Sequence, residues 1–197
     1  VGKSALLYQL SQEKGFRFIA DDLTIISDKS YSYFQGRCIS LKPYHLKYYM
    51  FLYDKIKNSM ASIQRLQWRI FNDNRLTYRI KPTEIFDEIC ERSKIKRIIH
   101  FCNHSKDTFE IKDITSNDLI DYTIPILINE LSLANNKLNS VASLPTSPFQ
   151  SSERMYAATK DIFSKAFNDV DIKLIFVPYH SNPLKLFNFL KQERCLD

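Results

Sequence analysis

Two short polar clusters near the start of the chain carry the residue types that phosphate chemistry needs. The first, Val1-Gly2-Lys3-Ser4, matches the end of the phosphate-binding loop motif G-x-x-x-x-G-K-[ST]. The second is the carboxylate pair that follows an apolar stretch, at positions 21 and 22. Glycine lets the backbone approach an anion, lysine supplies a mobile cation, and a serine hydroxyl can ligate Mg²⁺. The two clusters together predict a site for a nucleotide and Mg²⁺.

The phosphate-binding motif is incomplete in this sequence. Val1 would be the last of its four variable positions, so the leading glycine and the strand before it would lie upstream of residue 1. We therefore expect residues 1–197 to form a single truncated nucleotide-binding domain, with weak or no affinity for nucleotide by itself. The expected nucleotide-binding residues are Val1, Gly2, Lys3, Ser4 and Ala5.

The elements that must position these clusters are those of an α/β fold. From Ser4 onward leucines follow one helical stripe, and Gly15 is a natural end for that helix. Residues 16–20 are aromatic and β-branched, which predicts a buried strand. Such a strand would place Asp21 and Asp22 at the carboxyl edge of a sheet, where ligands bind in α/β proteins. An ordinary turn before a helix, or a solvated turn or helix cap at the aspartates, is the alternative explanation.

Residues 1–27 resemble the nucleotide-binding core of the HPr kinase/phosphorylase family, which is related to phosphoenolpyruvate carboxykinase. The likeness rests on V-G-K-S-A-L-L-Y-Q-L, followed by K-G-F-R-F-I-A-D-D-L-T-I-I-S. It implies an α/β fold: a P-loop-containing, HPr kinase-like mixed sheet flanked by helices, with the first strand and part of the P-loop missing.

The resemblance also implies a function. It implies a bacterial, cytoplasmic, ATP-dependent and Mg²⁺-requiring phosphotransferase that resembles HPr serine kinase. Its partners would be the nucleotide and a hydroxyl-bearing protein, peptide or small-molecule acceptor. By the resemblance, Gly2, Lys3 and Ser4 bind phosphate and metal, and Asp21 and Asp22 supply the general base and the metal carboxylate. The order of the two aspartates stays open, although Ser4 and Asp22 are the expected metal ligands.

The chain departs from the family in one segment. HPr kinases follow the aspartate-bearing region with a Glu-x-Arg segment that contributes to catalysis, whereas residues 34–41 here contain no glutamate. We therefore expect a divergent relative with another acceptor. A nucleotide-binding or regulatory module without phosphate transfer is the alternative function.

A row of cations occupies one face of a further predicted strand. In residues 75–82 apolar and cationic side chains alternate, as in a strand with one buried face. Phosphoryl transfer needs a cation as charge spreads over the γ-phosphate oxygens, and Arg79 is the best candidate for this catalytic role. The alternative is a solvated sheet edge, whose charges discourage aggregation.

The charge of the chain is uneven. The net charge is +6, and residues 42–106 contain 14 Lys and Arg against 6 Asp and Glu. This basic part would attract a nucleotide or an acidic acceptor, although a solvated surface is the simpler explanation. A nucleic-acid partner is disfavoured because no recognised binding module is present. The number of subunits stays open.

The sequence lacks two features that bear on the location of the protein, a membrane span and a C-x-x-C pair. No apolar run approaches the roughly 18 residues of a membrane span, so we expect no membrane partner. The four cysteines are scattered without a C-x-x-C pair, which is typical of reduced thiols in a cytoplasmic protein.

The remaining pattern predicts elements along the whole chain. Strands are expected at residues 23–27, 31–34, 38–41, 95–102, 108–111 and 172–177, with 31–34 and 38–41 forming a hairpin and 172–177 central in its sheet. Helices are expected at residues 43–53, 55–71, 84–92, 117–133, 153–167 and 183–191, with a kink at Pro125 and a loop at 135–152. His100, Cys102 and His104 share one face of the predicted strand, a pattern that could bind zinc, but ordinary sheet residues are the preferred interpretation.

Overall fold

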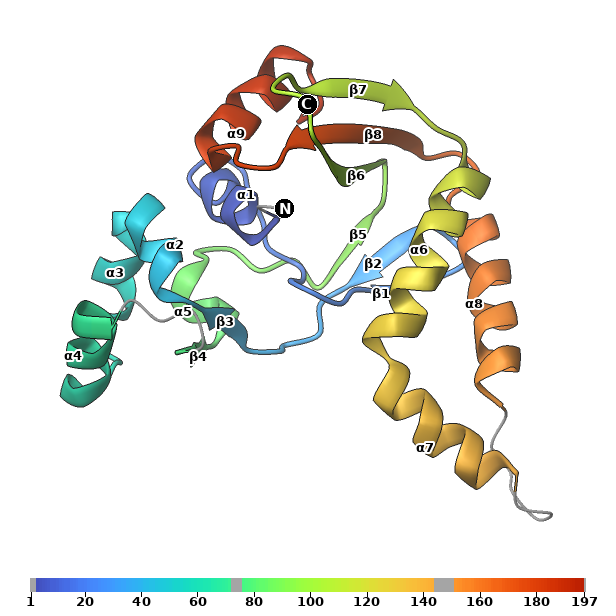
Figure 1. Ribbon diagram of the computed structural model, residues 1–197, viewed down its shortest axis with the longest axis horizontal. Coiled ribbons are helices and arrows are strands. Elements are labelled where there is room, and N and C mark those ends of the chain that lie inside the picture. The colour runs from blue at the N-terminus through green and yellow to red at the C-terminus, as the bar shows by residue number, and fades with distance from the viewer. Residues whose placement is uncertain (1–2, 72–75, 144–150, 197) are drawn as a thin grey trace.

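The protein is a mixed α/β structure in which helices surround three small sheets (Figure 1). The computed structural model describes residues 3–71, 76–143 and 151–196. Across those residues, every helix is too short or too polar to cross a lipid bilayer.

The largest of these sheets is built on one central strand. Strand β8 (Asp171–Pro178) pairs in parallel with β6 (Arg97–His104) and antiparallel with β7 (Glu110–Asp113). The expectation that residues 172–177 form a central strand is therefore confirmed. Its apolar side chains face two sides: Ile175 packs with α1 (Lys3–Leu10) and α9 (Pro183–Gln192), and Ile172 with α6 (Ser116–Glu130) and α8 (Ser152–Ala166).

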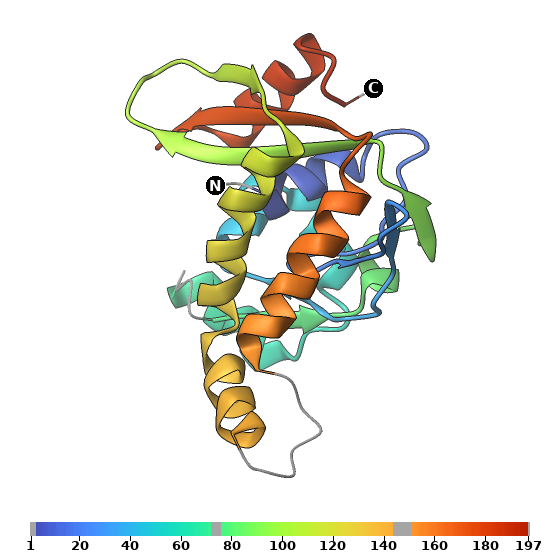
Figure 2. The ribbon, with the colours of Figure 1, turned by 90° about the vertical axis from the view of Figure 1, so that its right-hand side faces the viewer.

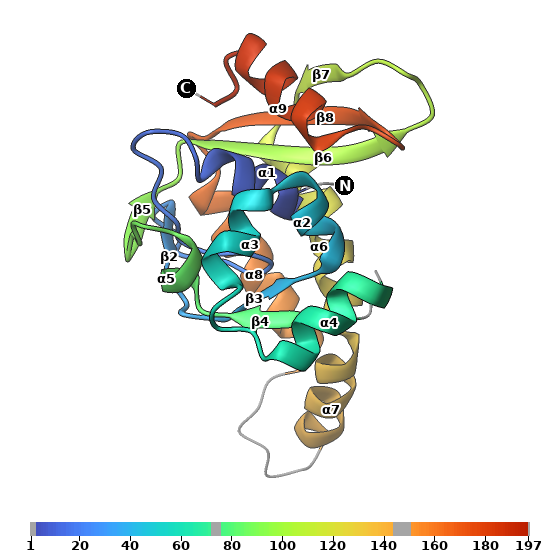
Figure 3. The same ribbon diagram turned by 90° about the vertical axis from the view of Figure 1, so that its left-hand side faces the viewer.

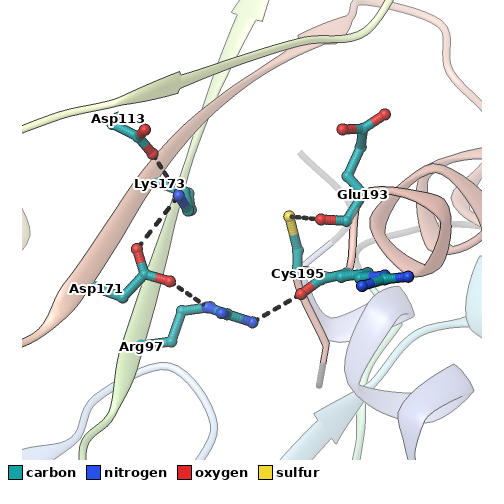
Figure 4. A network of polar contacts seen from close by, with 7 residues as sticks. Arg97, Asp113, Asp171, Lys173, Glu193 and Cys195 are labelled. Carbon is teal, nitrogen blue, oxygen red and sulfur yellow. Dashed lines mark hydrogen bonds and ion pairs between the residues drawn. The ribbon is translucent and has the colours of Figure 1, made fainter.

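The register of β6 and β8 is set at their first residues by a polar network (Figure 4). The Arg97 Nε donates to Asp171 Oδ2 at 2.6 Å, and an Arg97 terminal nitrogen donates to the Arg194 carbonyl at 2.9 Å. Lys173 bridges Asp113 and Asp171. This network ties β7 and the C-terminal segment to the sheet at the end opposite the carboxyl ends of β6 and β8.

The two smaller sheets pair differently from the predicted hairpin. Strand β2 (Tyr31–Tyr33) lies between β1 (Ile25–Ile26) and β5 (Arg92–Lys94), whereas β3 (Ile39–Leu41) pairs with β4 (Tyr78–Ile80). The predicted hairpin of residues 31–34 with 38–41 is therefore wrong. The reason is burial: Ile39 and Leu41 are almost fully buried, and pairing with β4 places them beside the equally buried Ile80.

The segment before the aspartate pair is also less regular than predicted. Residues 16–20 make a single parallel bridge, Phe18 to Ile89, in place of a strand. The Phe18 N–H donates to the Glu88 carbonyl at 3.0 Å, and the Cys90 N–H donates to the Phe18 carbonyl at 2.8 Å. The Phe18 ring is buried and stacks on Phe86 with centroids 4.3 Å apart. Packing of this one ring thus anchors the segment.

The helices follow the predicted pattern best where that pattern is strongest. The helices are α1 (Lys3–Leu10), α2 (Pro43–Tyr48), α3 (Met50–Ile56), α4 (Ser62–Phe71), α5 (Pro82–Ile85), α6 (Ser116–Glu130), α7 (Ser132–Ala142), α8 (Ser152–Ala166) and α9 (Pro183–Gln192). Helices α8 and α9 confirm their predictions closely, and α6 contains Pro125 as expected. Figure 2 shows α6 and α8 side by side, consistent with their shared core cluster.

Three helix predictions and one loop prediction need correction. The helix predicted at 43–53 is interrupted at Tyr49, whose backbone leaves the helical region at φ −133° and ψ 77°. The helix predicted at 55–71 begins only at Ser62, after a turn. The helix predicted at 84–92 ends at Ile85, because Phe86 enters the core and Arg92 begins β5. Residues 135–142 belong to α7, not to a loop, and residues 144–150 of that predicted loop lie outside the described part of the chain.

Helix α1 is shared by two hydrophobic cores. Leu6 packs with β8 and α9, whereas Ala5 and Tyr8 pack with α3, the β3–β4 pair and Phe86. Figure 3 shows α1 between the large sheet and the α2–α3 pair, as these contacts require. Because both cores hold it, the start of α1 is fixed relative to every neighbouring element.

Candidate functional site

The candidate site begins at the first turn of α1. Lys3 is exposed there, Ser4 is half-buried, and the Ala5 side chain is in the core. The N–H groups of a first helical turn have no partner within the helix and carry partial positive charge. Two of the expected nucleotide-binding residues, Val1 and Gly2, lie outside the described residues.

A tight turn presents the two aspartates. The Leu23 N–H donates to the Asp21 carbonyl at 2.8 Å, which closes a three-residue turn around Asp22. Asp22 has φ of 61°, a left-handed conformation that non-glycine residues adopt infrequently and at a cost in free energy. Strained backbone of this kind clusters at binding sites, where the surrounding structure holds it in place.

Asp21 lies against the start of α1. Burial raises the pKa of the Asp21 carboxyl above its ordinary value, and the negative charge of Asp22 raises it further. The Asp22 N–H, the charge of Lys3 and a hydrogen bond from the Ser4 side chain oppose this rise in pKa. Lys3, Ser4 and Asp21 are thus brought together at the start of α1, with Asp22 next to Asp21 in the turn.

His100 of β6 is the histidine whose pKa is influenced by Lys3. Burial lowers the pKa of the His100 imidazole, and the nearby positive charge of Lys3 lowers it further. The ring stacks on Tyr122 of α6 with centroids 5.6 Å apart. The strand pattern suggested grouping His100 with His104, but His104 contacts the Thr108 carbonyl at 2.8 Å instead. Among the described residues no three His, Cys, Asp or Glu side chains form a metal-binding group.

Tyr8 lies close enough to both aspartates for their charges to affect its hydroxyl, and the sequence patterns did not identify it as a site residue. Its side chain is fully buried, and its hydroxyl has no hydrogen-bond partner among the described residues. Burial, Asp21, Tyr44 and Asp22 all raise the pKa of the Tyr8 hydroxyl. A buried hydroxyl beside two carboxylates calls for a polar partner such as a water molecule or a ligand atom.

His45 packs behind Tyr8 as an uncharged ring. Its Nδ1 accepts a hydrogen bond from the Lys42 N–H at 3.2 Å, and its ring meets the Tyr8 ring edge-on at 5.2 Å. Burial and, to a lesser extent, the charge of Lys42 lower the pKa of His45 from 6.5 to about 4. The folded protein therefore disfavours the imidazolium form.

We expect this histidine to make the free energy of unfolding fall in mild acid. The stabilisation is complete above pH 6.5 and is lost as the pH falls toward 4, because in this window the unfolded chain binds a proton at His45 that the folded chain does not. The loss reaches about 3 kcal/mol at most. Urea unfolding at a series of pH values measures it. His45→Gln should flatten the slope, whereas the exposed control His180→Gln should keep it; an unchanged slope in His45→Gln would contradict the assignment.

The remaining predicted catalytic residue, Arg79, lines a cleft together with the two aspartates. Its volume is about 330 Å³, and its lining residues are Asp21, Asp22, Arg37, Cys38, Ile39, Ser40 and Arg79. Arg79 of β4 lies directly across from Ser40 of β3 in the strand pairing. The three predicted catalytic residues thus line one cleft. Arg37 was missed as a site residue because it belonged to the predicted hairpin, and only the adjacent Gly36 marked a turn there.

A larger concavity of about 700 Å³ lies at the carboxyl ends of β6 and β8. It is lined by the 105–109 and 178–182 segments and Lys185. Its lysine Lys106 is paired with Glu110 at 2.6 Å, and it contains no pair of carboxylates. The chemistry therefore favours the smaller cleft as the reactive site.

Comparisons of the chain with protein-family models, with curated proteins and with solved structures give no match. The structure itself shows a mixed α/β fold.

Proposed function

We propose that the protein is an ATP-dependent phosphotransferase that transfers the γ-phosphate to a hydroxyl acceptor. The observation that carries the proposal is the convergence of Lys3, Ser4 and Asp21 at the start of α1. A cation, a hydroxyl and a carboxylate at a helix N-terminus form the combination that holds a nucleotide phosphate with its Mg²⁺.

We further propose a P-loop fold of the HPr kinase kind for this domain. The proposal is supported by the first turn of α1, which begins within the Gly-Lys-Ser motif, and by its packing on the sheet that contains the parallel pair β6 and β8.

The donor set fits Mg²⁺ bound together with a nucleotide. Mg²⁺ prefers oxygen ligands, and in phosphate-transfer sites it often uses one or two carboxylates plus phosphate oxygens. The Ser4 hydroxyl lies near enough to the Asp21 carboxyl to lower its pKa, and we propose that both groups ligate one small ion. The raised pKa of Asp21 reflects burial and the adjacent Asp22, a negative environment that a cation would relieve. We therefore assign Ser4 and Asp21 to the metal, which would neutralise charge on the β- and γ-phosphates.

The other aspartate is placed to act as the base. Asp22 is exposed at the cleft, where an acceptor hydroxyl can approach it. Its carboxylate would accept the proton as the hydroxyl attacks phosphorus, and Lys3 would bind the phosphate oxygens. Such catalysis depends mostly on positioning and charge stabilisation, so few residues suffice.

A nucleotide-binding module without phosphate transfer is the second candidate. The absence of glutamate from residues 34–41 favours it, because these residues form the wall of the cleft without supplying a further carboxylate. The two candidates share the nucleotide site and differ in whether Asp22 has a catalytic role.

Nucleotide binding tests both candidates together. Lys3→Gln should weaken Mg²⁺·ATP binding to the intact protein about 10- to 100-fold, because it removes a charged hydrogen-bond donor from the phosphates. Isothermal titration calorimetry measures the affinity. Lys14→Gln makes the same change of charge at an exposed position beyond α1 and should leave the affinity unaltered. Equal binding by the two variants would refute a phosphate site at α1.

A further inference from the structure

We infer that the cleft beside Asp22 binds a small acceptor that carries an anionic group, a phosphate or a carboxylate, in addition to its hydroxyl. This inference depends on the proposed function for the transfer step, whereas the binding of the anion can be measured separately. It starts from the two arginines of the cleft, Arg37 and Arg79.

Both guanidinium groups are unpaired in the described part of the chain. Arg37 and Arg79 are exposed, line the cleft, and make no ion pair or hydrogen bond with another described side chain. Arginine presents a planar fork of donors that matches a phosphate or carboxylate in a bidentate manner. Asp21 and Asp22 in the same lining balance the charge of the arginines, so the two forks would bind an anionic group directly while a neighbouring hydroxyl of the same ligand reaches the aspartates.

The pairing of β3 with β4 explains why these side chains meet. Ile39 and Leu41 point into the core, so the intervening Ser40 points to the opposite face. Arg79 lies across from Ser40, while its neighbour Ile80 is buried. The face of this two-stranded sheet that lines the cleft is therefore polar, and the Ser40 hydroxyl is a further hydrogen-bonding group on it.

The position of the arginines assigns them to the acceptor rather than to the nucleotide. The cleft lining includes both aspartates, but neither Lys3 nor Ser4 belongs to it. The arginines therefore share a cleft with the aspartates and not with the start of α1. Arg79, considered above as a transition-state cation, would instead bind the acceptor on the far side of Asp22.

The size of the cleft favours a small molecule. About 330 Å³ is at the lower end of the roughly 300–1,000 Å³ typical of ligand pockets. In the transfer, the acceptor oxygen would bond to the γ-phosphorus and its proton would pass to Asp22. The bond from the γ-phosphorus to the bridging oxygen would break, and ADP would leave with that electron pair.

Cys38 offers a local reporter of binding, because it is exposed and lines the same cleft. We would measure its alkylation by iodoacetamide, a neutral reagent, with peptide-resolved mass spectrometry of the intact protein. The probes are glycerol 1-phosphate and glycerate, each with a hydroxyl and an anionic group, and glycerol as the neutral match. Either anionic probe should slow alkylation at Cys38, and glycerol should not.

Variants distinguish binding of the anion by Arg37 and Arg79 from a general effect of the positive charge of the protein. Arg37→Gln and Arg79→Gln should each raise the probe concentration needed for half-protection about 10-fold or more, because each removes charged hydrogen bonds. Arg17→Gln, the same change at an exposed position outside the cleft lining, should have no effect. Protection by glycerol, equal loss in Arg17→Gln, or protection only by an acidic peptide would overturn the inference.

The same measurement distinguishes this inference from the proposed function. Protection that is lost in both arginine variants, without any phosphate transfer from ATP, would retain the anion site and reject the kinase. Phosphate transfer to some acceptor without anion protection of Cys38 would retain the kinase and reject the anion site.

Discussion

Asp22→Asn is expected to lower the rate constant of phosphate transfer about 10³-fold, within the range that a positioned general base contributes. An asparagine side chain keeps the size and much of the polarity of aspartate but cannot accept the proton of the attacking hydroxyl. Because Asp22 is exposed at the cleft and Asp21 is the carboxylate beside Ser4, the affinity for Mg²⁺·ATP should change little. The transfer of label from γ-³²P-ATP to the acceptor measures the rate constant. Calorimetry measures the affinity for Mg²⁺·ATP separately.

Asp21→Asn and Asp28→Asn complete this experiment. Asp21→Asn removes the carboxylate assigned to the metal and should weaken Mg²⁺·ATP binding as well as transfer. Asp28 is exposed in the turn between β1 and β2, so Asp28→Asn controls for the loss of one negative charge. A transfer rate in Asp22→Asn equal to that of Asp28→Asn would reject Asp22 as the base. It would favour the non-catalytic module.

Phe18→Ala is expected to reduce the free energy of unfolding by about 3 to 5 kcal/mol, the cost of removing a buried aromatic ring. The Phe18 ring is 2% exposed, stacks on Phe86 and meets Phe34 edge-on. Stacked and edge-to-face aromatic pairs add stability beyond the area that they bury. Urea unfolding monitored by circular dichroism measures the loss.

The same substitution should also loosen the site. The segment of residues 16–20 is held by one backbone bridge at Phe18, and Asp21 follows three residues later. Without the ring, the position of Asp21 relative to Ser4 is less restricted, so Mg²⁺·ATP affinity should fall. Phe163→Ala is the matched control, since Phe163 is half-buried in the separate α6–α8 cluster. It should lose less stability and retain ATP affinity; equal losses in both variants would contradict the anchoring role.

Several elements could be predicted because their signal is local. The apolar run of β8 and the helical stripe of α8 are strong periodic patterns, and Asn182 with Pro183 marks the start of α9 by its capping chemistry. The short strands and helices were harder to predict from local sequence patterns. Residues 84–92 have a good helical start, but burial of Phe86 and pairing of Arg92 with Tyr33 override that local preference.

Local order along the chain already shows which residue types are available for chemistry: the Gly-Lys-Ser motif, a carboxylate pair and an alternating basic strand. These features depend only on near neighbours in the chain. Long-range packing brings Asp21 near Ser4, places Arg79 across from Ser40, and adds Tyr8 and Arg37 to the surroundings of the aspartates. These contacts join residues far apart in sequence. They follow from burying Phe18, Ile39, Leu41 and Ile80 in one core, which no local periodicity encodes.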